Sequence, residues 1–141
     1  MKFVTLQLYL IFILCLVGCD RGDGKLTLIN NSTDTIYFDS PYCGDSILSY
    51  PIYIKNGKID TLYSNMILPK QEHHSIVMDS WEYFINTRCK DSTIRVIFFN
   101  NTLIKTAGKD SIMKYQLYSK KFKLKVKDLE KLNWEVEYKG E

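Results

Sequence analysis

Histidine and cysteine are the side chains of this sequence best able to bind a metal ion or attack a substrate. The two histidines, His73 and His74, are adjacent. Neighbouring side chains of a strand point to opposite faces, so this pair cannot hold one metal ion without a distorted backbone. Glu72 and Asp79 lie close in sequence, but their spacing matches no zinc-ligand pattern. We therefore expect solvent-edge histidines, with no metal and no cofactor.

Nucleophilic catalysis has equally little support in the sequence. Cys43 or Cys89 would need a neighbouring base and a lowered thiol pKa to act as a nucleophile. The chain has no Gly-x-Ser-x-Gly element and no glycine-rich loop that could bind phosphate. Glu135 and Glu137 could form a carboxylate pair, but on a terminal strand such charges more often keep the edge soluble. The sequence predicts a protein that is not an enzyme.

The N-terminal segment has the layout of a secretory signal. Lys2 supplies a positive charge, residues 8–17 are apolar, and the chain turns polar directly after Cys19 with the sequence DRGDG. A membrane-spanning helix needs roughly 20 apolar residues, which is more than this stretch provides. Export followed by cleavage is therefore favoured over a transmembrane anchor.

The four residues 16–19, with the sequence LVGC, resemble the lipobox of bacterial lipoproteins. The resemblance implies that the Cys19 thiol is diacylglycerylated and that the chain is cut before this residue. Several buried acyl chains, each contributing about 0.8 kcal/mol per methylene group, anchor a protein stably. We expect a lipid-anchored envelope protein, held in the outer membrane through acylated Cys19. Whether it faces the periplasm or the cell surface stays open.

The two cysteines beyond the lipobox, Cys43 and Cys89, form an even pair in a chain expected to be exported. Oxidising compartments favour the pairing of such cysteines, which predicts a disulfide. Two separate reduced thiols stay open as the alternative for an anaerobic organism.

Strand and turn patterns fill most of the remaining chain. Residues 25–29 and 35–38 flank the turn-forming sequence NNSTD and predict a hairpin, and Asn56-Gly57 predicts a second one. The continuous apolar stretch 93–99 predicts a central strand buried on both faces. Further strands are expected at 74–78, 121–126 and 134–138.

Short helices are expected at 79–86, 110–118 and 127–132. Asp79 or Ser80 would cap the first of them, and Asp110 or Ser111 the second. These elements indicate a mainly β fold, a β-sandwich-like antiparallel sheet with two or three short helices. The expected organisation is a signal peptide over 1–18, a lipidated tether over 19–24 and a single β-rich domain over 25–141.

Three parts of the mature chain carry a family resemblance. They are residues 26–37 (LTLINNSTDTIY), residues 81–84 (WEYF) with 96–99 (VIFF), and the ending 118–122 (YSKKF) with 129–134 (LEKLNW). Together they resemble small uncharacterised lipoproteins of Bacteroides-type Gram-negative bacteria. The resemblance implies a one-domain, β-rich lipoprotein and supplies no activity.

The same bacterial group O-glycosylates exported proteins at Asp-Ser or Asp-Thr followed by an apolar residue or Thr. Five places in the chain match this pattern. Asp-Ser and Asp-Thr are also ordinary turn and cap dipeptides, so both interpretations stay open. The five acceptor hydroxyls belong to Thr35, Ser46, Thr61, Ser92 and Ser111.

Charge and aromatic content restrict the partners. The formal net charge of +3 is small and scattered, which argues against nucleic acid as a partner. The lysines of 120–127 alternate with apolar residues and predict the solvated face of a strand. Five tyrosines could form a platform for a glycan or a peptide, although core packing is favoured. They are Tyr37, Tyr42, Tyr50, Tyr53 and Tyr63.

The leading hypothesis is a membrane-anchored, non-catalytic binding or accessory module of the cell envelope, with an envelope protein or a glycan as ligand. The alternatives are a structural envelope protein and an envelope enzyme with an unrecognised site. A large exposed apolar or aromatic patch would favour binding, and a buried cleft with converging polar groups would favour an enzyme. A featureless charged surface would favour the structural role.

Overall fold

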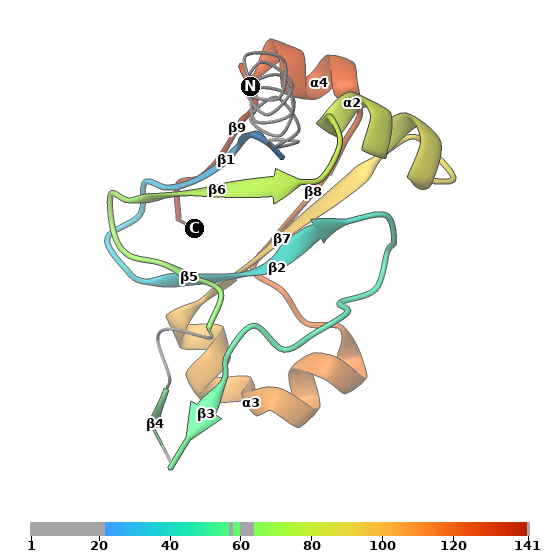
Figure 1. The fold of residues 1–141 in the computed structure, drawn as a ribbon. Helices are drawn as coiled ribbons and strands as arrows, with labels where there is room; N and C mark the ends of the chain where they lie inside the picture. The colour runs from blue at the N-terminus through green and yellow to red at the C-terminus, as the bar shows by residue number, and fades with distance from the viewer. Residues whose placement is uncertain (1–21, 57, 60–63, 141) are drawn as a thin grey trace, which may run out of the picture.

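A computed structural model describes residues 22–56, 58–59 and 64–140. Two β-sheets pack face to face, and a helix covers the other side of the larger sheet (Figure 1). The strands are β1 (Asp23–Asn30), β2 (Ile36–Tyr42), β3 (Ile54–Lys55), β4 (Lys58–Ile59), β5 (Met66–Ile67), β6 (Glu72–Val77), β7 (Ile94–Asn100), β8 (Lys120–Leu124) and β9 (Glu135–Tyr138). The helices are α2 (Trp81–Tyr83), the π-helical turn η1 (Phe84–Arg88), α3 (Asn101–Tyr115) and α4 (Val126–Lys131).

The expected mainly β, sandwich-like fold is confirmed. One sheet has the strand order β6-β1-β9 and the other the order β5-β2-β7-β8, while β3 and β4 form a separate small hairpin. The strand pairs of the described chain are antiparallel except β1 and β9, which run parallel. The chain reaches β9 from β8 of the other sheet through helix α4. Strand β9 is therefore not joined to β1 by a hairpin, and the two strands can run parallel.

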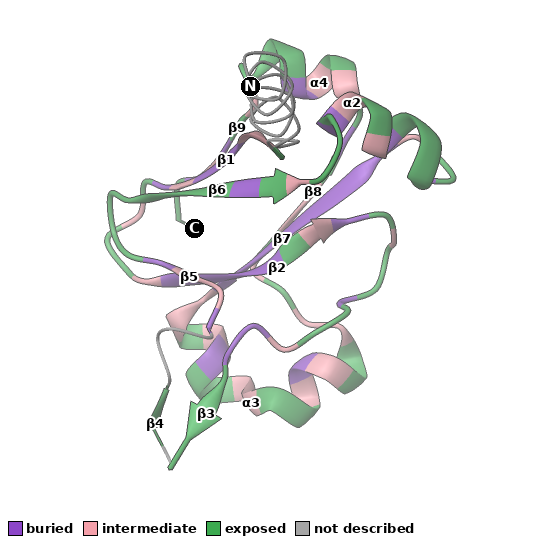
Figure 2. Ribbon diagram, viewed as in Figure 1, coloured by how far each residue is buried: buried purple, intermediate pink, exposed green. Residues whose placement is uncertain are grey.

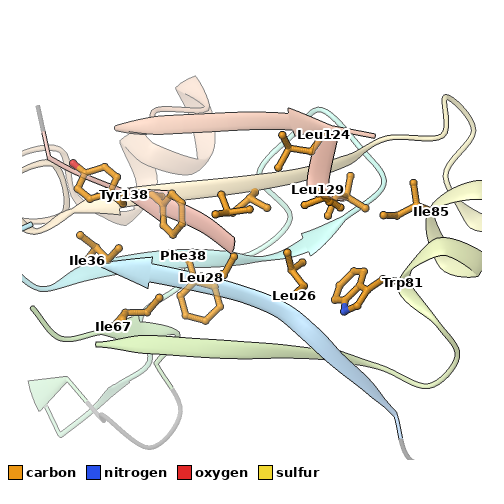
Figure 3. Close-up of a cluster of buried hydrophobic side chains, with 14 of the residues drawn as sticks. Leu26, Leu28, Ile36, Phe38, Ile67, Trp81, Ile85, Leu124, Leu129 and Tyr138 are labelled. Atoms are coloured by element: carbon orange, nitrogen blue, oxygen red, sulfur yellow. The ribbon is translucent and has the colours of Figure 1, made fainter. Parts of the chain in front are cut away.

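The sandwich core lies between the two sheets. Leu26 and Leu28 of β1 are fully buried, and they share one hydrophobic cluster with Phe38 of the facing sheet (Figure 3). Trp81 and Ile85 belong to the same cluster and are buried as well. Burying a large apolar side chain contributes about 1.5–3 kcal/mol, so this cluster is the main source of the fold's stability.

A second core lies on the opposite face of the larger sheet. Ile97 and Phe99 of β7 form a cluster there with Ile104 and Ile112 of α3. Strand β7 is therefore buried on both faces, as the apolar stretch 93–99 predicted. Figure 2 shows this burial along the strand.

The helix predicted over 110–118 begins nine residues earlier than expected, at Asn101. Asn100 is its N-cap and accepts a hydrogen bond from the amide of Leu103 at 2.8 Å. Gly108, at φ 70° and ψ 167°, interrupts the helical geometry, so the predicted helix corresponds to the second half of α3. Asp110 and Ser111 lie within α3 and are not its N-cap. The sequence predicts a helix start there because Asp and Ser are favoured N-cap residues, and both follow the interruption at Gly108 closely.

The hairpin predicted from residues 25–29 and 35–38 is wrong, because β1 and β2 belong to different sheets. The side chain of Asn30 is fully buried in the connection. Its Nδ2 donates to the carbonyl oxygens of Asp34 at 2.8 Å and Ile67 at 2.9 Å, and its Oδ1 accepts from the amide of Ser32. These hydrogen bonds direct the chain across the sandwich instead of back along one sheet.

Other boundaries also differ from the expected ones. Strand β1 begins at Asp23, so the last two residues of the predicted tether belong to the sheet. The Asn-Gly hairpin is present, with Asn56 at a φ of 53°, but each of its strands has only two residues. Ser80 caps α2 as predicted, since its hydroxyl accepts from the amide of Tyr83 at 3.1 Å. The ending predicted as a strand is β9, with Val136 and Tyr138 in the sandwich core.

Replacing Asn30 by alanine should lower the free energy of unfolding by about 2 kcal/mol, because the buried carbonyl group of Ile67 and the carbonyl group of Asp34 would lose their hydrogen-bond donor. Urea unfolding followed by tryptophan fluorescence measures this change. Asn31→Ala is the matched control at an exposed neighbour and should change the stability by less than about 0.5 kcal/mol. Equal losses in both variants would contradict the role given to Asn30.

Candidate functional site

A disulfide ties together two loops at one end of the sandwich. Cys43 follows β2 directly, and Cys89 follows η1. Their Sγ atoms lie at bonding distance and their Cα atoms are 4.8 Å apart, although 46 residues separate them in sequence. The fold thus brings together the two cysteines that the sequence indicated as a pair.

Arg95 connects the same two loops through charge. Its side chain, near the start of β7, is only 2% exposed. Nε donates to Asp45 at 2.7 Å and Nη2 to Asp91 at 2.8 Å. The ammonium groups of Lys121 and Lys123 lie 3.4 Å and 3.1 Å from the same two carboxylates, respectively. These lysines, expected to form a solvated strand face, are therefore members of an ion-pair cluster.

The sequence contains a signal for this cluster, in the residues around Arg95 and the two cysteines. An arginine within a continuous apolar strand needs a partner of opposite charge, because an unpaired buried guanidinium is costly. Asp45 and Asp91 each lie two residues after a cysteine of the disulfide. The repeated Cys-x-Asp spacing therefore placed both counter-charges beside the covalent link.

The carboxylates of the cluster are held in their charged form. Hydrogen bonds from Thr93 and Arg95 hold the pKa of the Asp91 carboxyl well below its usual range, and the hydrogen bond from Arg95 lowers the pKa of Asp45. On the same side of the sheet, burial together with the nearby Asp39 raises the pKa of Tyr42 to about 12. The charged carboxylates of Asp45 and Asp91 and their ion pairs with Arg95 connect the two loops.

Cys43 also lines an open, mostly apolar groove of about 610 Å³. The end of β6 forms one wall, and η1 forms another. Ile76 is 71% exposed there and Met78 is 82% exposed, the two highest values among the large hydrophobic residues at the surface of the described chain. The lining residues are Cys43, Ile76, Val77, Met78, Asp79, Phe84 and Arg88. We call this feature the apolar groove.

Trp81 fixes the chain between β6 and α2, and thereby the wall of the groove. Its ring is buried, and its indole Nε1 donates to the carbonyl of Ser75 at 3.2 Å. Its backbone amide donates to Asp23 Oδ2 at 2.9 Å, at the start of β1. Because Trp81 turns inward from this short connection, Met78 and Asp79 remain at the surface.

A second hollow, of about 350 Å³, has a more polar lining than the apolar groove. It is lined by the turn after β1, the start of α3 and the residues after β9. Two of its polar residues help to shape the fold. Ser32 bonds to Asn30, and Asn100 caps α3.

The two histidines have separate surroundings, as their adjacency predicted. The ring of His73 packs on Phe38, with centroids 4.6 Å apart, and burial lowers the pKa of His73. His74 contacts the hydroxyl of Thr27 at 3.1 Å and the carboxylate of Glu72 at 3.3 Å. Within the described ranges, no group of three or more His, Cys, Asp or Glu side chains could hold a metal ion.

The tyrosines do not assemble into one platform. Tyr37 and Tyr42 are buried in the second core, Tyr50 packs against it, and Tyr53 is about half exposed. Tyr63 lies outside the described residues. Of the carboxylate pair, Glu135 is exposed and Glu137 forms an ion pair with Lys139 at 2.9 Å.

The candidate modification sites differ in accessibility. Ser46 is exposed, whereas Thr35, Ser92 and Ser111 are half-buried. Cys19 and Thr61 lie outside the described residues. Whether any of these hydroxyls carries a glycan stays a prediction.

No protein-family model matches the chain, and no curated protein or solved structure is significantly similar to it. Among the helices of the described ranges, none combines the length and the apolar character needed to cross a bilayer.

Reduction of the disulfide should lower the free energy of unfolding by about 4 kcal/mol, since the bond restricts the unfolded chain over a long loop. Urea unfolding with and without a phosphine reductant measures the difference. A Cys43→Ala/Cys89→Ala variant should be unaffected by the reductant. Unchanged stability of the wild-type protein after complete reduction would contradict the prediction.

The ion-pair cluster should make the stability fall in acid. The pKa values of Asp45 and Asp91 are lowered by folding, so their stabilisation is present above the unfolded pKa of about 3.9 and is lost as the pH falls through the folded values. Asp91→Asn should therefore show a smaller loss in urea midpoint between neutral pH and pH values below about 4. Asp110→Asn, an exposed change on α3, is the control and should retain the wild-type pH dependence.

Proposed function

We propose that the protein is a lipid-anchored, non-catalytic binding or accessory module of the cell envelope. The lipobox-like residues before Cys19 support the anchor. The observation that carries export is the pairing of Cys43 with Cys89, because disulfides persist in oxidising compartments outside the cytoplasm. Acylated Cys19 would hold the domain to membrane lipid, with the outer membrane as the proposed location.

The apolar groove supports a binding role over the two alternatives. An enzyme would need converging polar groups with suitable protonation, whereas the charged groups beside the disulfide are paired with one another. A structural protein with a featureless charged surface would not expose Ile76 and Met78 to this extent. We propose an envelope protein or a glycan as the ligand.

Intact-mass measurement of the protein purified from native membranes tests the anchor, the disulfide and the glycans together. We expect the mass of residues 19–141 plus acyl groups, less two hydrogens for the disulfide. Sugar increments would report modification of the acceptor hydroxyls, with Ser46 as the most exposed of those described. An unacylated chain that retains residues 1–18 would overturn the proposal.

Replacement of Cys19 by serine should abolish acylation and cleavage, because the reactive thiol is lost. Fractionation of cells and mass spectrometry of the variant measure both effects. Cys89→Ala is the control, because it removes a cysteine without touching the lipobox and should leave acylation intact. A Cys19→Ser protein that is still cut before residue 19 and retained in the membrane fraction would contradict the lipoprotein assignment.

A further inference from the structure

We propose that the apolar groove is the face of the domain that lies on the lipid bilayer, with Ile76 and Met78 inserted at the headgroup boundary. This inference rests on the proposed acylation of Cys19 and names the partner of the groove. It starts from the exposure of these two side chains, 71% and 82%, at alternate positions on and just beyond an edge strand. Exposed aliphatic side chains beside a groove indicate a contact surface.

The first described residues, Gly22 and Asp23, lie directly beside the end of β6. Asp23 is paired with Val77 in the first register position of β1 and β6. Gly22 is in close contact with the same strand, since a Cβ atom at this position would lie 2.6 Å from Cγ2 of Ile76 and 2.7 Å from the carbonyl oxygen of Val77. Figure 1 shows the start of β1 beside the end of β6. The absence of a side chain at Gly22 allows the backbone to lie this close to Ile76.

The short tether decides which surface meets the membrane. Cys19 precedes Gly22 by three residues, and a fully extended chain of that length spans at most about 11 Å. An acylated Cys19 would therefore hold the adjoining wall of the groove within reach of the headgroup region. Apolar side chains of lipid-anchored proteins add binding energy when they enter this boundary.

The groove also has a charge suited to a phospholipid surface. Arg88 is exposed and lines the groove together with Phe84. Its guanidinium can bind a headgroup phosphate while the apolar side chains enter the boundary below it. Asp79 lies on the same rim, so net charge contributes little, and the contact depends mainly on Ile76 and Met78.

Hydroxyl-radical footprinting tests this orientation. The acylated protein would be reconstituted into vesicles of phosphatidylethanolamine and phosphatidylglycerol and compared with the non-acylated mature chain carrying Cys19→Ser. Met78 and Ile76 should lose most of their labelling on the vesicles. Tyr115, which is 62% exposed on α3, should be labelled equally in both samples.

A paired variant tests whether the aliphatic side chains hold the domain on the bilayer. With Ile76→Asp/Met78→Asp, labelling of Phe84 in the acylated, vesicle-bound protein should rise to the level of the non-acylated chain. Tyr115→Asp is the matched control and should leave Phe84 protected. Both changes are at exposed positions, so the fold should persist.

The outcomes separate this inference from the proposed function. A chain that mass spectrometry shows to be unacylated removes the proposed anchor itself. An acylated protein whose Met78 is labelled equally on and off vesicles overturns the membrane-facing groove and leaves the anchor standing. Protection of Met78 that depends on protein concentration in the absence of lipid would assign the groove to a second copy of the chain and would also overturn the inference.

Discussion

The pairing of one buried charge organises one end of the sandwich. Arg95 lies in the central strand β7, where its guanidinium is removed from water. An unpaired charge there would destabilise the fold strongly, so the carboxylates of Asp45 and Asp91 have to reach it. Each carboxylate belongs to a loop that the Cys43–Cys89 disulfide joins. Covalent linkage and charge pairing therefore constrain the same two loops.

This constraint gives the apolar groove a rigid side. Cys43 lines the groove, and the disulfide connects it to the end of η1, which supplies Arg88. The opposite wall, at the end of β6, is held by Trp81 through its bonds to Ser75 and Asp23. Segments far apart in sequence thus meet beside the first described residue of the chain. A lipid-anchored accessory protein would present this end toward its membrane, which is the orientation that we propose.

Local patterns predicted several elements but not their partners. The central strand, the Ser80 cap and the Asn56 turn each depend on side chains within a few residues of one another, and each is present. The first hairpin failed because alternating apolar residues predict a strand without specifying its neighbour. The side chain of Asn30 makes that choice by bonding to the carbonyl of Ile67, which lies 37 residues further along the chain.

The sequence by itself determined the mainly β character, the candidate disulfide and the signal-like N-terminus, because these follow from composition, periodicity and short motifs. Only the tertiary structure decided that Lys121 and Lys123 are ion-paired rather than free and that Tyr37 and Tyr42 are core residues. The tertiary structure alone showed that Ile76 lies beside Gly22, the first described residue. The physical reason is that burial, charge pairing and grooves are properties of segments brought together by folding, and a linear pattern carries no record of those distances.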